Sequence, residues 1–328
     1  MPRRATLAES RKARRRQPRK SHDRNAAMNV ARWFCLVALA SVSLETGAQD
    51  TYTLLIFGDS GTGRQAQRQV AEAMSQACRQ SSCDAALVLG DLIYPRGVKS
   101  VDDRRFTTRF EGPYEVVGPF PFWMSPGNHD HERAGSVEAE IAYGRSGRSE
   151  RWRMPAAHYA VEGLPDWLHV YMLDTQPIAR NSASPEQAQR AAAALCGKPG
   201  WRLLAGHHPV YSNGAHGDND DVRRYLEPVL RDCGVQAYFA GHDHHQEHIS
   251  TPSFEQFIQG AAAKLRGVDT ATYAPDFAIT QRFARSTLGF AIAAFTERAM
   301  DVRFFAAEHG QAREIYRCRA TVDAPACK

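Results

Sequence analysis

Short apolar runs alternate with helical patterns along the first two thirds of the chain. The segments TLLIFGD (53–59) and AALVLGD (85–91) are typical of buried strands that end on an acid. Between them, residues 64–79 carry apolar side chains at helical spacing. A strand, a helix and a second strand in this order predict two parallel neighbouring strands.

The same kind of pattern continues toward the C-terminus. Further strands are predicted at 120–130, 168–174, 201–209 and 237–245, and helices from Ser184-Pro185-Glu186 to about 195 and at 221–231. Residues 254–319 alternate like an antiparallel meander, with the segments FEQFIQG, LGFAIAAF, MDVRFFAAE and EIYRC. We expect residues 134–151 to form a surface loop with a short helix, and residues 273–285 to form a loop over the site described next.

Side chains that can bind metal ions follow five of the predicted strands, because these strands end at Asp59, Asp91, Asn128, His207 and the histidines of 242–245. Open sheets place their ligand sites at the carboxyl ends of strands. Together with a tyrosine three residues after the second strand, the predicted donors are Asp59, Asp91, Tyr94, Asn128, His207, His242 and His244. Carboxylate, phenolate, amide and imidazole donors suit two hard divalent or trivalent ions, with one carboxylate bridging them. A packed core tyrosine is the alternative for Tyr94, and the six accompanying donors favour the ligand.

Five short motifs carry a resemblance to a known family. GDSG (58–61), GDLIY (90–94), GNHD (127–130), AGHHP (205–209) and GHDH (241–244) resemble the motifs of the purple acid phosphatases, within the calcineurin-like metallophosphoesterases. The tartrate-resistant type is the most similar, and the likeness also includes 101–111, 139–143, 151–155 and 215–217. The resemblance implies an α/β fold: a four-layer α/β/β/α sandwich of two mixed sheets in a single domain.

The resemblance also implies a dinuclear metal centre. Asp59, Tyr94 and His244 would bind Fe(III), Asp91 would bridge, and a divalent ion (Fe, Zn or Mn) would take the remaining ligands Asn128, His207 and His242. Most calcineurin-like enzymes have a histidine two residues after the first aspartate, where this chain has Gly61. Tyr94 resembles the family's replacement for that histidine.

The other histidines near these motifs differ in what they predict. His129 and His216 match family positions that contact the substrate phosphate, so both are predicted to be catalytic, with Asp130 orienting His129. His131 and His208 are open between a supporting role in the site and a structural one. His245 and His248 are expected to be surface or loop residues.

The resemblance implies a secreted purple acid phosphatase that hydrolyses small phosphomonoesters. A metal-bound hydroxide would attack phosphorus directly, with an acidic pH optimum and no phospho-enzyme. One alternative is a phosphodiesterase or nucleotidase of the same superfamily. A second alternative, from another class, is a secreted non-catalytic protein that binds metal or phosphate.

The N-terminus is predicted to be removed. Residues 1–27 are a basic extension, residues 28–48 resemble a secretory signal peptide rather than a buried helix or membrane anchor, and residues 49–328 form the catalytic domain. Either Met1 or Met28 is the start.

The chain has 41 Lys and Arg residues and 36 Asp and Glu residues. Residues 1–48 hold 11 of the basic and 3 of the acidic residues, so 30 basic and 33 acidic residues remain without them. The basic charge therefore belongs to the extension, and we expect neither nucleic acid nor, after signal removal, a membrane as a partner.

The cysteines favour an oxidising compartment. Seven cysteines are present, and six remain when Cys35 in the apolar run is set aside. An even number in an exported chain indicates disulfides, although fifteen pairings and six free thiols are alternatives. The most local pairing is Cys78–Cys83, Cys196–Cys233 and Cys318–Cys327. A secreted or periplasmic location is the prediction.

Overall fold

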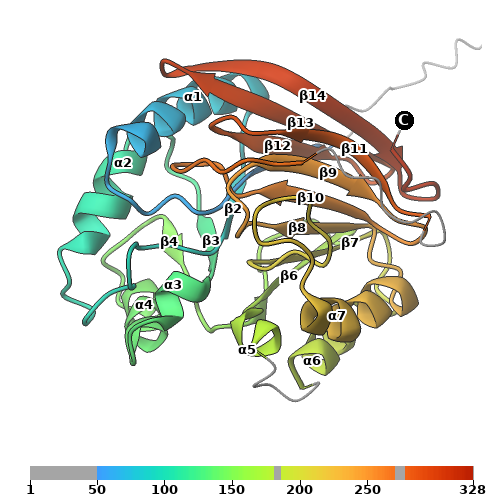
Figure 1. Cartoon of the computed structure of the whole chain (residues 1–328), viewed down its shortest axis with the longest axis horizontal. Coiled ribbons are helices and arrows are strands. Elements are labelled where there is room, and N and C mark those ends of the chain that lie inside the picture. Colours follow the sequence, from blue (N-terminus) through green and yellow to red (C-terminus); the bar gives the residue numbers. More distant parts are fainter. Residues whose placement is uncertain (1–49, 181–185, 270–277, 328) are drawn as a thin grey trace, which may run out of the picture. The chain divides into compact units, whose positions relative to one another are not determined.

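The strands of the protein form two mixed sheets (Figure 1). The computed structural model describes residues 50–180, 186–269 and 278–327. Its strands are β1 (Tyr52–Phe57), β2 (Ala85–Leu89), β3 (Phe122–Ser125), β4 (Trp152–Arg153), β5 (Tyr159–Ala160), β6 (Leu168–Leu173), β7 (Trp201–Gly206), β8 (Ala237–Ala240), β9 (Gln246–Ser250), β10 (Glu255–Gln259), β11 (Thr280–Arg285), β12 (Gly289–Phe295), β13 (Ala299–Glu308) and β14 (Gln311–Thr321).

Helices fill the connections between the parallel strands. They are α1 (Gln65–Ser81), a short π-helix (Thr107–Glu111), α2 (Gly112–Tyr114), α3 (Asn128–His131), α4 (Ser136–Arg145), α5 (Gln176–Ala179), α6 (Glu186–Leu195) and α7 (Asp220–Asp232). The predicted helices at 64–79 and 221–231 are confirmed as α1 and α7. The predicted start of α6 at 184–185 lies outside the described residues.

Each sheet has seven described strands, and part of each is paired in parallel. The first sheet has the order β14-β13-β12-β1-β2-β3-β4, and the second has the order β11-β9-β10-β8-β7-β6-β5. β1 pairs with β2 in parallel, as the strand–helix–strand pattern predicts, because α1 carries the chain back across the sheet. β2, β3 and β4 continue the parallel part, and β6, β7 and β8 form the corresponding part of the second sheet.

The predicted C-terminal meander is only partly correct. β12, β13 and β14 pair antiparallel in the first sheet. FEQFIQG, however, becomes β10 in the second sheet, where it pairs parallel with β8 and antiparallel with β9. An alternating pattern shows that a segment is a strand but does not specify its neighbour.

One expectation for the loops is confirmed and another is wrong in part. The short helix expected within 134–151 is α4, whose Val137, Glu140 and Tyr143 are buried. Residues 280–285 form β11, which pairs with β9, instead of a loop over the site. The remainder of that predicted loop, 270–277, lies outside the described residues.

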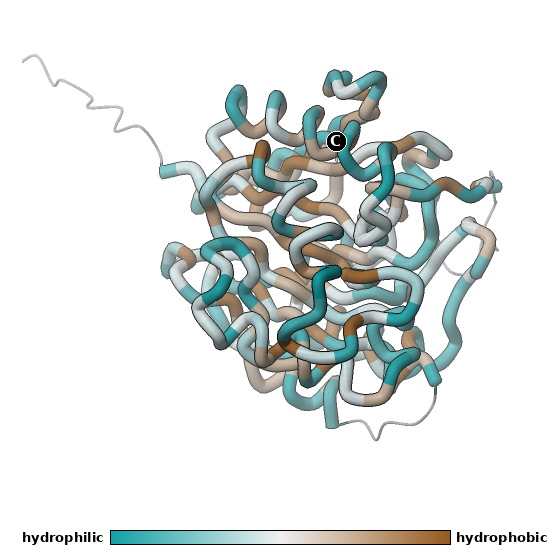
Figure 2. Tube along the Cα trace, turned by 90° about the vertical axis from the view of Figure 1, so that its left-hand side faces the viewer, coloured by the Kyte–Doolittle hydropathy of each residue, from teal (hydrophilic) through white to brown (hydrophobic). Residues whose placement is uncertain are grey.

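The fold has four layers, and apolar side chains pack between them. Leu54, Ile56 and Leu87 of the first sheet meet Val170 and Phe239 of the second. The alternate residues of β1 pack instead under α1, and the outer face of the second sheet packs under α6 and α7. The predicted α/β/β/α sandwich is confirmed (Figure 1). Hydrophobic segments run through the interior strands, and the outer turns are largely hydrophilic (Figure 2).

The structure contains three disulfides, and they match the predicted pairing. They join Cys78 to Cys83, Cys196 to Cys233 and Cys318 to Cys327. The predicted basic extension and signal peptide lie outside the described residues. Within the described part of the chain, no helix is long and apolar enough to cross a membrane.

The disulfides are expected to contribute unequally to stability. Cys196–Cys233 closes a loop with a sequence separation of 37, against 5 for Cys78–Cys83. Chain entropy predicts that the double change Cys196→Ala/Cys233→Ala lowers the free energy of unfolding by about 4 kcal/mol, and Cys78→Ala/Cys83→Ala by about 2 kcal/mol. Denaturant unfolding of both variants and the wild type measures this. Equal losses would show that loop closure does not govern these bridges.

Candidate metal centre

The turns after β1 and β2 cross each other so closely that one glycine is required. The Asp59 amide donates to the Gly90 carbonyl at 3.0 Å, and the Tyr94 amide donates to the Gly61 carbonyl at 2.9 Å. A Cβ at Gly61 would lie 1.7 Å from the Leu92 carbonyl oxygen. The histidine that most calcineurin-like enzymes are expected to carry at this position therefore has no room here.

Tyr94 takes part in a first group of donors. Its hydroxyl lies 3.1 Å from Asp59 Oδ1 and 3.2 Å from His244 Nε2. All three side chains are buried. The tyrosine, which comes from the crossing turn, thus reaches the space beside Asp59 that no side chain at position 61 can use.

A second group of donors comes from three different strand ends. Asn128 Oδ1 lies 3.0 Å from His207 Nε2 and 3.1 Å from His242 Nδ1, and these two nitrogens are 3.2 Å apart. His207 Nδ1 lies 2.8 Å from the Leu89 carbonyl oxygen, which can only accept. The proton of neutral His207 is therefore on Nδ1, and the lone pair of Nε2 points at the other two donors.

Asp91 lies between the two groups. Its Oδ1 is 3.5 Å from His207 Nε2 and accepts the His129 amide at 3.0 Å. Its carboxylate also interacts with the Tyr94 hydroxyl of the first group. All seven predicted donors are therefore brought to one place, with Asp91 in contact with both sides.

Without a cation, the ionised forms of the buried acids and the phenol in this cluster are unfavourable. Burial raises the pKa of Asp59 to about 8, although His207 opposes the shift. Burial and then the two aspartates raise the pKa of Tyr94 well above its ordinary value. Asp59, Asp91 and His242 also have left-handed backbone conformations, with φ of 58°, 51° and 70°. Such strain in ordinary residues is typical of functional sites.

His129 lies beside this cluster, but Asp130 does not orient its ring. His129 Nδ1 lies 2.6 Å from the Pro95 carbonyl oxygen and 3.0 Å from Glu132 Oε1, and Nε2 lies 3.9 Å from Asp91 Oδ2. The buried Asp130 carboxylate instead accepts the amides of Leu92, Ile93 and Gly127 at 2.8–3.1 Å. Because those amides precede Tyr94 and Asn128, Asp130 fixes the two turns rather than the histidine.

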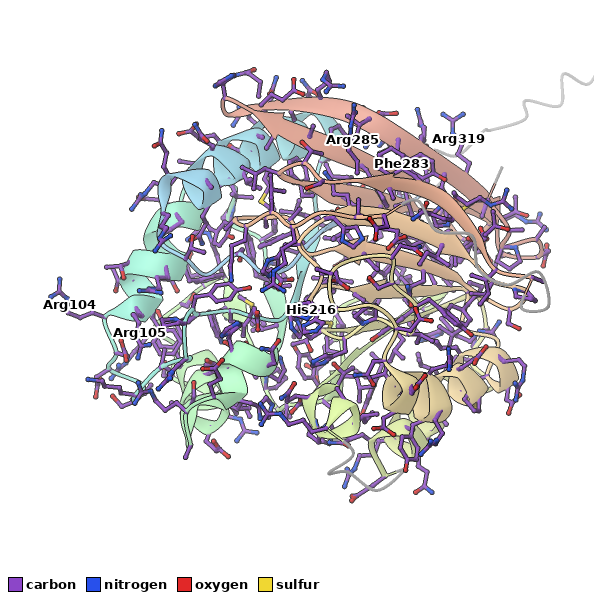
Figure 3. All side chains as sticks on the ribbon, in the orientation of Figure 1. Arg104, Arg105, His216, Phe283, Arg285 and Arg319 are labelled. Atoms are coloured by element: carbon purple, nitrogen blue, oxygen red, sulfur yellow. A yellow bond between two sulfur atoms is a disulfide. The ribbon has the colours of Figure 1, made fainter. Side chains whose placement is uncertain are left out.

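His216 lies on the solvent side of the second group. Its ring stacks on the His242 ring at a centroid distance of 4.2 Å, and its amide donates to Asp243 Oδ1 at 3.0 Å. The Arg266 guanidinium donates to His216 Nε2, because a guanidinium has no acceptor. Burial and then Arg266 lower the pKa of His216 against the opposing effect of Asp243. In Figure 3, His216 lies near the middle of the view, between α3 and α7.

Two histidines expected at the surface are buried, and that expectation is wrong. His245 and His248 are fully buried because the polar strand β9 is covered on both faces. His245 Nε2 pairs with Glu247 Oε2 at 2.9 Å, and His248 Nε2 pairs with Glu255 Oε2 at 2.6 Å. The carboxylate partners offset the free-energy cost of burying the two imidazoles.

His131 and His208, whose roles the sequence left open, contact other side chains near the site. His131 Nε2 pairs with Asp174 Oδ2 at 2.9 Å. His208 is buried, and its Nδ1 lies 2.8 Å from Thr175 Oγ1. The His208 ring lies 4.5 Å from the His242 ring, centre to centre, so it packs behind one of the predicted donors.

Comparison with known proteins identifies the family. Residues 52–246 match the calcineurin-like phosphoesterase family. The chain belongs to this family. Human tartrate-resistant acid phosphatase type 5 is 30% identical to this phosphoesterase over 258 residues, which cover 70% of the present chain and 78% of the human one.

Two solved structures share the fold of this calcineurin-like phosphoesterase. GAP50, described as the anchor in the inner membrane complex of Plasmodium, has a TM-score of 0.71 at 20% identity and covers 83% of this chain and 89% of its own. The purple acid phosphatase PPD1 from yellow lupin has a TM-score of 0.65 at 14% identity and covers 82% of this chain and 54% of its own. At these identities the likeness concerns the fold alone.

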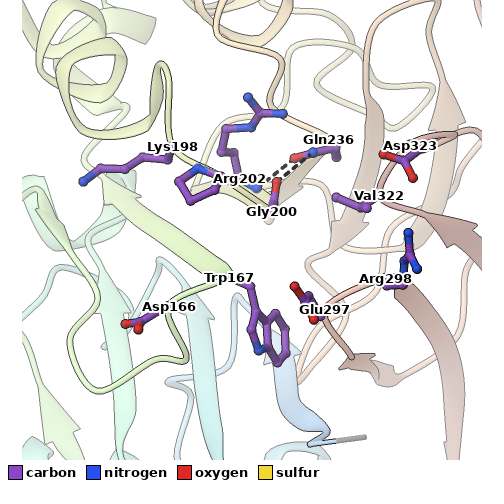
Figure 4. A pocket seen from close by; sticks show the side chains of 11 residues that line it. Asp166, Trp167, Lys198, Gly200, Arg202, Gln236, Glu297, Arg298, Val322 and Asp323 are labelled. Carbon is purple, nitrogen blue, oxygen red and sulfur yellow. Dashed lines mark hydrogen bonds between the residues drawn. The ribbon is translucent and has the colours of Figure 1, made fainter.

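One wide cavity of this phosphoesterase lies away from the donors. It has a volume of about 860 Å³ and is lined by residues that include Trp167, Arg202 and Gln236 (Figure 4). Trp167 precedes β6, Arg202 is the second residue of β7 and Gln236 precedes β8, so the cavity is at the amino ends of the parallel strands. The donors are at the carboxyl ends, where sheets of this kind bind ligands.

Sequence reasoning missed two cations beside the donors. Lys264 Nζ lies 3.8 Å from the centre of the Tyr94 ring, and Arg266 contacts His216. Burial, followed by these two cations, lowers the pKa of His244 to about 3. Their only sequence signal is that they follow the carboxyl end of a predicted strand, in GAAAKLRG (260–267).

The crossing of the two turns can be tested at Gly61. In Gly61→Ala the new Cβ collides with the Leu92 carbonyl, so the turn that carries Tyr94 must move. We expect the free energy of unfolding to fall by about 2 kcal/mol or more, and the bound metal per chain to decrease.

Gly267→Ala is the matched control, because a Cβ there meets nothing within 4 Å. Denaturant unfolding and elemental analysis of both variants give the two readouts. A Gly61→Ala protein with wild-type stability and metal content would contradict the close crossing.

Proposed function

We propose that this protein is a secreted or periplasmic purple acid phosphatase that hydrolyses small phosphomonoesters at a dinuclear centre of Fe(III) and a divalent ion. The observation that carries the proposal is the arrangement of seven donors in two groups on either side of Asp91. Two carboxylates, a phenol, an amide oxygen and three imidazoles fit two hard or borderline ions, with Fe, Zn or Mn as the divalent one.

In this proposal each group of donors holds one ion. Asp59, Tyr94 and His244 hold Fe(III), and Asp91 bridges. The second group, Asn128, His207 and His242, holds the divalent ion. Burial and the two aspartates raise the pKa of Tyr94, so its phenol would ionise only with a cation beside it. The preference for Fe(III) comes from the phenolate itself, which is a hard anionic donor. When bound, the ions would supply Lewis-acid activation of the phosphoryl group and of the attacking water.

The protein's own side chains would position the substrate. The Pro95 carbonyl and Glu132 hold Nδ1 of His129, so Nε2 remains on the side of Asp91 for a phosphate oxygen. The Asp243 carboxylate holds the backbone of His216, whose ring covers His242. Both imidazoles are thus placed to stabilise charge on a bound phosphate, and His129 is placed to protonate a leaving oxygen.

The human relative supports the reaction, since it is named an acid phosphatase and matches most of both chains. A non-catalytic protein of this fold would be expected to lack donors, and in this chain all seven donors, His129 and His216 are present. The three disulfides and the apolar run at 33–44 support an exported protein. An acidic pH optimum belongs to the same proposal.

Replacing the proposed bridging ligand tests catalysis. We expect Asp91→Asn to hydrolyse p-nitrophenyl phosphate at least about a hundredfold more slowly than the wild type, since it weakens both ion sites. Asp102→Asn, at a largely exposed surface ion pair with Arg148, is the matched control and keeps full activity. If the wild type were as slow as Asp91→Asn, the enzyme proposal would fail.

Replacing the phenol tests the trivalent ion. The purified, oxidised protein is expected to show a visible charge-transfer band from phenolate to Fe(III), and Tyr94→Phe is expected to lose it. Tyr225→Phe in α7 is the control and retains the colour. A colourless wild type that contains metal and is active would show that Tyr94 does not bind iron, and diesters and nucleotides would then be the first substrates to examine.

A further inference from the structure

The segment Lys264-Leu265-Arg266, here called the rim segment, runs along the edge of the donor cluster. The Arg266 amide donates to the His244 carbonyl at 3.0 Å. At the start of the same loop, a Cβ on Gly260 would lie 2.3 Å from the Asp243 carbonyl oxygen and 2.8 Å from Asp59 Oδ2. The loop is therefore pressed against the site at one end and tied to a predicted ligand at the other.

The two cations of the rim segment have no carboxylate partner among the described residues within ion-pair distance. Lys264 is half-buried over the Tyr94 ring, within electrostatic reach of Asp59 and Asp91. In the proposed function both of those carboxylates are metal ligands, so their charge is already compensated. Lys264 and Arg266 then remain as two fixed positive charges beside the substrate.

The position of Arg266 favours a contact beyond the transferred phosphate. The His216 ring stacks on His242, and Arg266 binds the Nε2 of that ring. Nε2 is at the edge of a ring whose face stacks on His242, and Arg266 is exposed to solvent. The guanidinium is therefore open to a group of the ester that extends outward from a phosphate held at the donors.

We propose that Lys264 and Arg266 are specificity-determining residues that bind a second anionic group on the organic part of the phosphomonoester. The inference rests on the proposed function and deepens it. The guanidinium fork matches a carboxylate or phosphate in two-point contact, and the ammonium adds a point charge. Substrates with two anionic groups are then preferred over those with one.

A matched pair of substrates tests the preference: 4-carboxyphenyl phosphate and 4-carbamoylphenyl phosphate have nearly the same shape and differ in charge. At a pH of about 6 the carboxyl group is ionised. We expect the wild type to have a kcat/KM about tenfold higher for the carboxylate, from charge-assisted hydrogen bonds. The preference should shrink at high ionic strength, because salt screens exposed charges.

Variants then assign the preference to the rim segment. Lys264→Gln and Arg266→Gln should each lower the ratio of the two kcat/KM values, and the double variant should bring it near one. Arg104→Gln, which removes an outward-pointing arginine at the far edge of the molecule (Figure 3), should keep the wild-type ratio.

Two results would overturn the inference, and they differ from each other. If the double variant lowers both kcat/KM values by the same factor, the cations act on the transferred phosphate or on the fold, and the specificity role is wrong. If the wild type hydrolyses neither substrate faster than Asp91→Asn, the proposed function fails and the inference fails with it.

Discussion

The close crossing of the turns after β1 and β2 is the contact on which the rest of the site depends. Because the Gly61 backbone touches the Leu92 carbonyl, the two parallel strands deliver Asp59 and Asp91 to the same small volume. The crossing leaves no room for a side chain at position 61, where the Leu92 carbonyl lies, and it brings the Tyr94 hydroxyl beside Asp59. This backbone contact therefore excludes a donor at position 61 and allows Tyr94 to take the place beside Asp59.

Buried carboxylates outside the donor set hold the loops of the site. Asp130 accepts three amides from the turns that carry Tyr94 and Asn128, and Asp243 accepts the amide of His216 and the hydroxyl of Ser212. Glu247 accepts Asn213, His245 and Gln281, and thereby ties β9 to the same loops. An ionised carboxylate is costly to bury, so each one is surrounded by donors. These buried carboxylates hold in place the loops that carry Tyr94, Asn128 and His216.

The two ends of the parallel strands serve different purposes. The carboxyl ends hold the donors, both candidate catalytic histidines and the rim segment, whereas the amino ends hold a wide cavity with mixed charges. The same layered fold occurs in a protein described as a membrane-complex anchor and in a plant phosphatase. The architecture alone does not specify an activity, and the side chains at the carboxyl ends carry the functional argument.

The sequence by itself predicted the parallel strands, the helices α1 and α7 and the seven candidate donors, because these depend on local pattern and on the residues that follow strand ends. For the disulfides it favoured the most local of fifteen pairings. It did not determine that β10 joins the second sheet, that β9 is buried with its histidines, or that Asp130 supports the turns instead of His129. Those features depend on which segments meet after folding, and a residue's neighbours across a sheet leave no periodic signal. Lys264 and Arg266 show the same limit. In the sequence they are two basic residues in a short loop, and only the tertiary structure places them beside Tyr94 and His216.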